Sequence, residues 1–243
     1  MALSALGVGA FGPIVIDRKA PDFGQLCETN KPGWSGFNLA AGLEKALKLP
    51  VRLVTDVGAA AVGEARLGAL RGLRIGIYLT IGTGIGGAIV VDGKVLPALL
   101  HPEMGHIALQ RLPGDSAPST CRFHDSCAEG LAAGPAIAAR FGTSLDKFTP
   151  DAPEFLMIAE YLGQFCCQLV LTLSPQRIVL GGGVCNAPGL IGAAHQAMVR
   201  RLGRYAPAAV ARPDYLAAPG LGEDAGITGA ALCAADRVPE SDG

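Results

Sequence analysis

The sequence predicts an α/β fold, in which short buried strands alternate with helices. Two observations support this expectation. Short apolar runs stop repeatedly at glycine, of which the 243-residue chain has 34, and this is typical of buried strands that end in tight turns. Between these runs lie longer segments whose apolar residues recur at helical spacing. We find no internal repeat and no low-complexity linker.

The first part of the chain predicts two strands and two helices. Residues 6–10 are an apolar run that stops at the turn residues FGP, and residues 51–56 form a second short apolar run. Residues 37–49 and 57–70 carry apolar side chains at helical spacing, and the second of these helices opens at Asp56.

A hairpin is expected next. Residues 74–82 and 87–96 are two successive strand-like runs, and the Asp92-Gly93 pair inside the second run is typical of a tight turn.

Helices and one further strand complete the pattern. Residues 154–173 form an apolar helical run, in which Cys166 and Cys167 are expected to fill the core. Residues 176–183 read as a strand that enters a triple glycine, and more helix follows.

Composition and charge exclude several classes of protein. Half of the residues are hydrophobic and 17% are charged, which is typical of a globular chain. A net charge of −1 and the lack of a Lys/Arg block argue against nucleic-acid and membrane-surface partners. Glycines interrupt the apolar stretches, so we expect no transmembrane helix, and no signal peptide is expected at the start. Seven cysteines, an odd number in a chain of this size, favour a reducing cytoplasmic compartment.

The segment CRFHDSC predicts a metal site. It places Cys121, His124 and Cys127 three residues apart in a chain with seven cysteines and four histidines. Zinc prefers four Cys and His ligands in a tetrahedron. The nearest other histidines are His101 and His106, and we expect His106 as the fourth ligand because the intervening loop closes easily. Four protein ligands leave no open position, so the site would be structural. The alternative is that these are surface loop residues.

A glycine loop is the second motif. Gly82, Gly84 and Gly87 match the G-x-G-x-x-G dinucleotide fingerprint, but that fingerprint requires a helix after the loop, and here a strand follows. A loop between two strands can still bind phosphate through its backbone N–H groups, with Thr83 adding a hydroxyl. A glycine hairpin without a ligand is the alternative. The glycines at 181–183 either approach a flat adenine or form an ordinary turn.

Three carboxylates are candidates for chemistry. Asp56 follows a strand and opens a helix, where the helix N-terminus stabilises its charged form. It could serve as a helix cap, or as the base that accepts a hydroxyl proton in phosphoryl transfer. Glu103 and Glu129 each lie close in sequence to a proposed metal ligand, so a metal that fixes this segment also fixes both carboxylates. Alone, each is a typical solvated side chain.

Together these segments resemble the ROK family of sugar kinases, most closely its fructokinase branch. The similar segments run in order along nearly the whole chain: GAFGP (9–13), KPGW (31–34), TDVGAAAVGE (55–64), TIGTGIGGAI (80–89), HPEMGH (101–106), CRFHDSCAEGLAAGPAI (121–137), IVLGGGV (178–184) and LGEDAGITGAA (221–231). The resemblance implies an actin-like, RNase H-like two-lobed ATPase fold. It places residues 1–70 and about 226–243 in a small lobe, residues 71–225 in a large lobe, and a zinc segment at 101–137.

The resemblance also implies roles for single residues. Asp56 would be the catalytic base; Thr55, Glu103, His106 and Glu129 would bind the sugar; Thr83, Gly84, Gly134, Pro135, Gly181, Gly182 and Gly183 would bind the nucleotide; His106, Cys121, His124 and Cys127 would hold a structural zinc. ATP with magnesium and a hexose, most of all fructose, are the implied ligands, and the implied assembly is a cytoplasmic homodimer.

The chain departs from the family pattern in three ways. Relatives carry Asn where this sequence has Gly58, which we expect to loosen the start of the helix, and Arg122 replaces a usual proline. Relatives also begin with a strand hairpin that carries an Asp/Glu-x-Gly-Gly-Thr phosphate loop, whereas MALSALG starts on an inner strand. We therefore expect a small lobe that is incomplete at its N-terminus, and weak or no turnover.

Other functions remain open from the sequence alone. The second hypothesis is a non-catalytic sugar-binding protein, because the family includes repressors. The third is an inactive remnant stabilised by zinc. A nicotinamide-dependent enzyme is a distant fourth.

Overall fold

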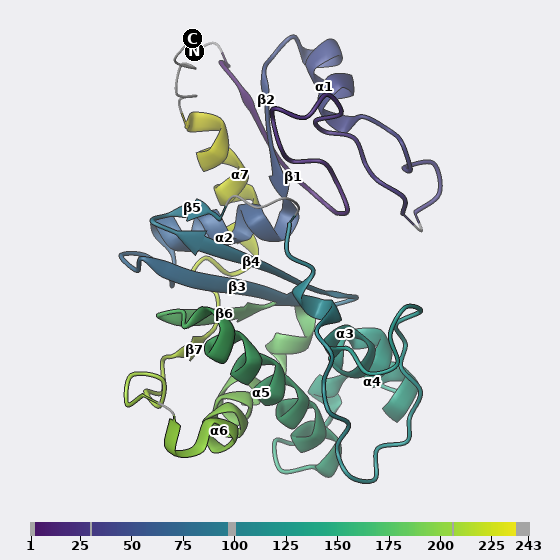
Figure 1. Ribbon diagram of the computed structural model, residues 1–243, viewed down its shortest axis with the longest axis vertical. Coiled ribbons are helices and arrows are strands. Elements are labelled where there is room, and N and C mark those ends of the chain that lie inside the picture. The colour runs from purple at the N-terminus through teal and green to yellow at the C-terminus, as the bar shows by residue number, and fades with distance from the viewer. Residues whose placement is uncertain (1–2, 30, 97–100, 206, 237–243) are drawn as a thin grey trace.

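Two β-sheets enclose a pair of helices in the computed structural model, which describes residues 3–29, 31–96, 101–205 and 207–236 (Figure 1). The smaller sheet pairs β1 (Leu6–Ala10) with β2 (Val51–Thr55) in parallel. The larger sheet has the strand order β5-β4-β3-β6-β7. Its strands are β3 (Ile75–Ile81), β4 (Ile85–Val91), β5 (Lys94–Val95), β6 (Arg177–Gly181) and β7 (Leu216–Ala217). Strands β3, β6 and β7 are parallel, and β4 runs antiparallel to β3 and β5.

The enclosed pair of helices is α2 (Asp56–Leu67) and α7 (Ala225–Ala235). They approach closely because small residues face each other: a Cβ on Gly63 would lie 2.5 Å from the carbonyl oxygen of Ala225. One side of α2 packs on β3 and β4, and α7 packs on β1 and β2. The pair therefore joins the two sheets. The lobe boundaries expected from the sequence remain a prediction, and residues 237–243 of that division lie outside the described part of the chain.

The opposite face of the larger sheet carries the main hydrophobic core (Figure 1). Four helices cover it: α3 (Ala128–Ala132), α4 (Gly134–Phe141), α5 (Pro153–Leu173) and α6 (Leu190–Leu202). Helix α5 is the one helix in the described ranges that is long and apolar enough to cross a membrane by length and composition. It packs on α6 and α3, and its Phe155, Phe165 and Cys166 are completely buried, as in a core helix.

The remaining elements are short. Helix α1 (Leu39–Leu47) covers the small sheet, and its N-cap Asn38 accepts a hydrogen bond from the Ala41 N–H at 2.9 Å. Five 3-10 helices lie at Met104–His106, Leu145–Lys147, Gly183–Asn186, Gly203–Tyr205 and Gly222–Asp224.

The structure confirms the expected elements and corrects their ends. The predicted helix at 57–70 stops at Leu67, because Gly68 leaves the helical conformation. The hairpin turn is confirmed, since Asp92 and Gly93 both have positive φ, at 49° and 75°. Cys166 and Cys167 are both buried, as expected of core residues.

A buried carboxylate fixes the end of α2 to the segment that precedes α7. Glu64 is fully buried. Its Oε2 accepts hydrogen bonds from the N–H groups of Ala69 at 2.6 Å and Gly220 at 2.9 Å, and its Oε1 accepts one from Leu221 at 2.8 Å. Hydrogen bonds to a charged acceptor are stronger than neutral ones, so this residue holds together segments that are more than 150 positions apart.

We predict that Glu64→Gln lowers the free energy of unfolding by roughly 1–3 kcal/mol, because the amide nitrogen cannot accept the hydrogen bond that one carboxylate oxygen accepts. Urea unfolding measures the change. Glu223→Gln, at an exposed position of the same region, is the matched control and is expected to change stability by less than about 0.5 kcal/mol. Equal stability of the two variants would contradict this role of Glu64.

Candidate active site

Four side chains form a cluster with the composition of a metal site. The ligand atoms of His106, Cys121, His124 and Cys127 all lie within 4.8 Å of one another. The Cys121 Sγ is 3.6 Å from His124 Nδ1 and 3.7 Å from His106 Nδ1, and the Cys127 Sγ is 3.8 Å from His106 Nδ1. Tetrahedral zinc with ordinary bond lengths separates sulfur and nitrogen ligands by about 3.6 Å. The donor set and its spacing therefore fit a closed, four-ligand metal site, and the structure brings together all four predicted ligands.

Backbone contacts bring the two arms of this cluster together. Ala108 and Cys127 form an antiparallel bridge, and the Leu109 N–H donates to the Ser126 carbonyl at 2.7 Å. The Arg111 guanidinium donates to the carbonyls of Ala117 at 2.7 Å and Asp125 at 2.6 Å, which spans the loop between the ligands. The cluster geometry thus does not depend on the ligand side chains alone.

Cys127 also begins α3. Its Sγ accepts a hydrogen bond from the Gly130 N–H at 3.4 Å, so the thiol occupies the N-cap position. Burial, followed by the neighbouring Cys121, raises the pKa of the Cys127 thiol to about 11. Metal ligation requires the thiolate, so a metal ion must displace a proton from Cys127 when it binds.

The orientation of His106 leaves one ring nitrogen for a second partner. Its Nδ1 faces the thiols of Cys121 and Cys127. The Nε2 lies on the far side of the ring and is directed away from the cluster. The double role expected from the sequence, in which one nitrogen binds metal and the other faces a hydroxyl, stays a prediction.

Glu129, in the first turn of α3, connects the metal-site segment to the glycine loop. Its Oε2 accepts a hydrogen bond from the Ile85 N–H at 2.9 Å, and a Cβ on Gly84 would lie only 2.7 Å from the same oxygen. A side chain at position 84 would therefore push this carboxylate oxygen away from its present position. Sequence reasoning placed Glu129 near the metal but missed this contact, because residues 44 positions apart give no local signal.

Glu103 lies at the start of the 3-10 helix that carries His106. Its carboxylate is half-exposed and lies 3.3 Å from Nδ1 of the largely buried His101. The His101 ring packs against Gly12, where a Cβ would come within 2.7 Å of it. Gly105 packs against the backbone of Ile85. The HPEMGH segment thus bridges the turn after β1 and the start of β4.

Thr55 and Asp56 divide the roles at the start of α2. Thr55 is the N-cap: it is buried, and its hydroxyl oxygen accepts a hydrogen bond from the Gly58 N–H at 3.0 Å. The cap is therefore Thr55, which corrects the alternative reading of Asp56. The Asp56 side chain is exposed, and its Oδ1 accepts a hydrogen bond from the Val57 N–H at 2.8 Å.

Gly58 lies close to the capping hydroxyl, and the looser helix start expected from the sequence stays a prediction. A Cβ at this position would lie 2.8 Å from the Thr55 hydroxyl oxygen. Glycine thus leaves room for the capping hydrogen bond.

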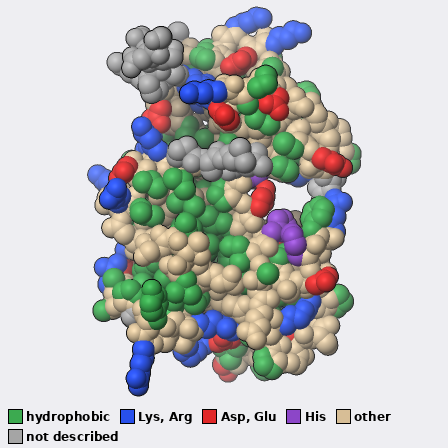
Figure 2. Space-filling model, viewed as in Figure 1, with side chains coloured by type: hydrophobic (Ala, Val, Ile, Leu, Met, Phe, Trp, Pro, Cys, Tyr) green, Lys and Arg blue, Asp and Glu red, His purple; other side chains and the backbone are tan. Residues whose placement is uncertain are grey.

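Packing brings α2 and the glycine loop to the same place. Val57 follows Asp56 directly, and a Cβ on Gly86 would lie 3.7 Å from the Val57 Cγ1. Gly86 is next to Ile85, whose N–H holds Glu129. Asp56 and Glu129 therefore approach the start of β4 from two different elements. In the space-filling view, histidine and acidic side chains border an open gap between the two parts of the molecule (Figure 2).

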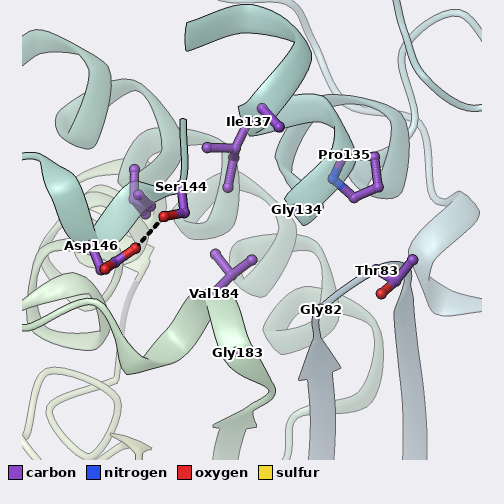
Figure 3. Close-up of a pocket in the computed structure, with 11 residues that line it drawn as sticks. Gly82, Thr83, Gly134, Pro135, Ile137, Ser144, Asp146, Gly183 and Val184 are labelled. Carbon is purple, nitrogen blue, oxygen red and sulfur yellow. Dashed lines mark hydrogen bonds between the residues drawn. The ribbon is translucent and has the colours of Figure 1, made fainter. Parts of the chain in front are cut away.

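A pocket of about 540 Å³ lies on the other side of the glycine loop (Figure 3). Gly82 and Thr83, in the loop between β3 and β4, line one end of it beside Gly134 and Pro135, and the Gly134 N–H donates to the Gly82 carbonyl at 2.7 Å. The remaining walls are Ile137, Ala138, Ser144, Leu145, Asp146, Gly183 and Val184. Apolar walls with a few polar groups are typical of a cofactor pocket.

Four of the seven residues predicted to bind the nucleotide line this pocket, namely Thr83, Gly134, Pro135 and Gly183. Gly84, Gly181 and Gly182 are not among its lining residues. Gly182 has a φ of 87°, which favours glycine, and packs against Ile81, so it shapes the strand end. Sequence reasoning missed Ser144, Leu145 and Asp146, which lie in a short 3-10 helix and its cap without a recognisable motif.

The glycine loop has the predicted strand-loop-strand form. Ile81 pairs with Ile85 across it, and β4 follows without a helix. This arrangement excludes the dinucleotide fingerprint, which requires a helix N-terminus at the loop.

Comparison with known proteins gives one consistent family. Residues 1–237 match the ROK family. The chain is 37% identical to a fructokinase from Pediococcus pentosaceus over 96% of this chain and 80% of that protein. It is also 37% identical to a fructokinase from Zymomonas mobilis, over 94% of this chain and 77% of that protein.

Solved structures agree with the sequence comparisons. A ROK hexokinase from Thermus thermophilus superposes with a TM-score of 0.76 at 35% identity, covering 95% of this chain and 78% of that one. A ROK family glucokinase from Streptomyces griseus, in complex with glucose and AMPPNP, gives a TM-score of 0.75 at 26% identity, covering 95% of this chain and 81% of that one.

We predict that Cys127→Ser abolishes tight metal binding and lowers Tm by roughly 5–10 °C, because a closed metal site contributes directly to folding stability. Elemental analysis of the purified protein and thermal melting measure the two effects. Cys27→Ser removes a thiol outside the cluster and is the control, for which metal content should stay near one ion per chain. Unchanged metal content in Cys127→Ser would contradict the assignment of this ligand.

Proposed function

The chain belongs to the ROK family, and from that premise we propose that it is a kinase that transfers the γ-phosphoryl group of ATP to a hexose, with fructose as the main substrate and fructose 6-phosphate as its product. The observation that carries this proposal is the 37% identity to fructokinases along nearly the entire chain. The likeness to a ROK hexokinase supports the same reaction class. A non-catalytic sugar-binding protein or an inactive remnant is less favoured, because these relatives are kinases.

Asp56 is the proposed catalytic base. Its exposed carboxylate lies in the first turn of α2, next to the capping residue Thr55. Asp56 would take the proton from the sugar hydroxyl as that oxygen attacks the γ-phosphorus of ATP. The capping role falls to Thr55, so Asp56 is not needed to satisfy the helix end.

We propose that the hexose binds between α2 and the metal-site segment. Glu103 and Glu129 would accept hydrogen bonds from sugar hydroxyls, and the outward Nε2 of His106 would contact another. Two of these three side chains are fixed by neighbouring groups. His106 contacts the thiol cluster, and Glu129 accepts a hydrogen bond from the Ile85 N–H. Such fixed groups reduce the entropy lost when the sugar binds. Thr55 contributes by holding the start of α2.

The nucleotide is proposed to occupy the 540 Å³ pocket. Thr83 and the adjacent Gly84 would hold phosphate with backbone N–H groups and a hydroxyl, while Gly134, Pro135 and Gly183 would border the adenosine. Gly181 and Gly182 shape the strand end behind this pocket. In this proposal the sugar binds on the side of the glycine loop that Glu129 contacts, and the nucleotide binds on the other side. In-line phosphoryl transfer requires the two substrates to meet across the loop in this way.

Two metals have different proposed roles. Zinc in the four-ligand cluster would be structural, since four protein ligands leave no position for a reacting water. Magnesium would arrive with ATP and neutralise charge on its phosphates, held mostly by phosphate oxygens and water. We also propose a cytoplasmic homodimer that has no nucleic-acid partner, in keeping with the near-zero net charge.

A direct assay tests the proposed reaction. The purified protein is incubated with ATP, magnesium and one of fructose, mannose or glucose, and ADP release is measured with product identification by NMR. We expect fructose to give the highest kcat/KM. Hexose binding without ADP release from any sugar would favour the non-catalytic alternative.

We predict that Asp56→Asn lowers kcat by about 10²–10⁴-fold while fructose affinity changes little, because the amide keeps the shape of the side chain but cannot accept the proton. Single-turnover kinetics and calorimetric titration with fructose measure the two quantities. Asp22→Asn, at another exposed position, is the control and should retain full activity. Normal turnover in Asp56→Asn would remove Asp56 from the mechanism.

A further inference from the structure

A second cavity, of about 430 Å³, lies apart from the proposed sugar and nucleotide sites. Its walls come from β2 and α2, from β5 at the edge of the larger sheet, and from α7. None of its lining residues belongs to the metal cluster, the glycine loop or the nucleotide pocket. The proposed kinase reaction therefore gives this cavity no role.

The side chains that line the cavity carry a net positive charge, whereas the net charge of the whole chain is −1. The charged lining side chains are four bases, Arg18, Arg52, Arg66 and Lys94, and one acid, Asp236. The whole chain has 20 basic and 21 acidic residues. A four-to-one excess in one concave surface creates a local field that attracts anions.

One of the four cations is already neutralised. The Arg66 guanidinium donates two parallel hydrogen bonds to the Asp236 carboxylate, both at 2.7 Å. This contact is the main reason that the pKa of Asp236 lies below its ordinary value. Asp236 also lies close enough to Lys94 for that charge to contribute to the lowered pKa, so Arg18 and Arg52 are the two cations without a counter-ion among the lining residues.

Arg52 has an unmet requirement for a hydrogen-bond acceptor. Its Nε is buried and has no partner within the described part of the chain. Arg18 is close enough for mutual repulsion: burial first, and then the charge of Arg52, lower the pKa of Arg18, with Glu44 acting in the opposite direction. The Arg18 guanidinium donates one hydrogen bond to the Val51 carbonyl, at 2.7 Å. Buried donors without acceptors are costly, so a ligand that accepts from these groups would be bound favourably.

We propose that this cavity binds a small phosphate-bearing metabolite, with Arg18, Arg52 and Lys94 as the phosphate ligands. Guanidinium groups match phosphate oxygens in pairs, and a dianion balances the unpaired cations better than a monoanion. The apolar side chains of Leu53, Val62 and Val95 offer a surface for the organic part of the ligand.

The place of the cavity gives the bound phosphate a structural consequence. Arg52 belongs to β2 of the smaller sheet, and Lys94 belongs to β5 of the larger one. A phosphate held by both side chains joins the two sheets. Residues Arg52 to Val54 also lead directly into Thr55 and Asp56 at the start of α2.

Calorimetric titration at constant ionic strength tests the proposal, with inorganic phosphate and fructose 6-phosphate as separate probes. We expect Arg52→Gln and Lys94→Gln each to weaken phosphate binding by at least about tenfold. Arg71→Gln, an exposed arginine outside the cavity, should bind as the unaltered protein does. Lys94 is exposed, so its variant remains informative even if Arg52→Gln fails to fold. The two probes are compared only through the binding that Arg52→Gln and Lys94→Gln lose, because fructose 6-phosphate is also the product of the proposed reaction. Within that part, tighter binding of the sugar phosphate would identify a phosphate ester as the ligand, and the reverse order would identify phosphate itself.

Thr83→Ala separates this cavity from the phosphate loop of the proposed active site. We expect this variant to retain the phosphate binding that Arg52→Gln and Lys94→Gln lose. Three results would overturn the proposal: no phosphate binding at millimolar concentration, equal binding by all variants, or a loss confined to Thr83→Ala. Each of these outcomes is independent of whether the protein phosphorylates fructose.

Discussion

A single hydrogen bond, which the backbone N–H of Ile85 donates to the Glu129 carboxylate, joins the two segments on which the candidate site depends. Glu129 follows Cys127 at the start of α3, so the cluster of thiols and imidazoles fixes where this carboxylate lies. Ile85 begins β4, so the larger sheet fixes the amide. The glycine loop that borders the 540 Å³ pocket is therefore held in place from the side of the thiol and imidazole cluster.

The same connection gives the proposed four-ligand metal site a positioning role, because phosphoryl transfer to a sugar needs no chemistry at such a metal. Phosphoryl transfer depends mainly on positioning, and a loop held only by its own backbone would sample many conformations. Here His106, Glu103 and Glu129 approach the start of β4 from one side, and the Asp56 helix approaches it from the other, with Val57 packed near Gly86. Glu64 and the close contact of α2 with α7 in turn fix the helix that carries Asp56.

Much of this arrangement was predictable from the sequence, for identifiable physical reasons. The strands were predictable because buried strands leave short apolar runs that end at glycine, and the Asp92-Gly93 turn was predictable because positive φ favours this residue pair. The cluster of His106, Cys121, His124 and Cys127 was predictable because Cys and His are rare in this chain and three of the four lie at regular spacing. Three features were not predictable, because each joins residues that are distant in sequence and carry no motif: the Glu129–Ile85 contact, the wall that residues 144–146 add to the 540 Å³ pocket, and the cation-lined cavity. The N-cap was misjudged by one residue, since Thr55 and Asp56 are both favourable capping residues.

A crystal structure with fructose and a non-hydrolysable ATP analogue, with data collected at the zinc absorption edge, tests the central claim most directly. The account predicts an anomalous peak bonded to the Nδ1 of His106, with the Nε2 of the same ring and the Glu129 carboxylate within hydrogen-bonding distance of sugar hydroxyls. A fructose molecule bound away from Glu129 and His106, or a cluster closed by a disulfide instead of a metal ion, would contradict it.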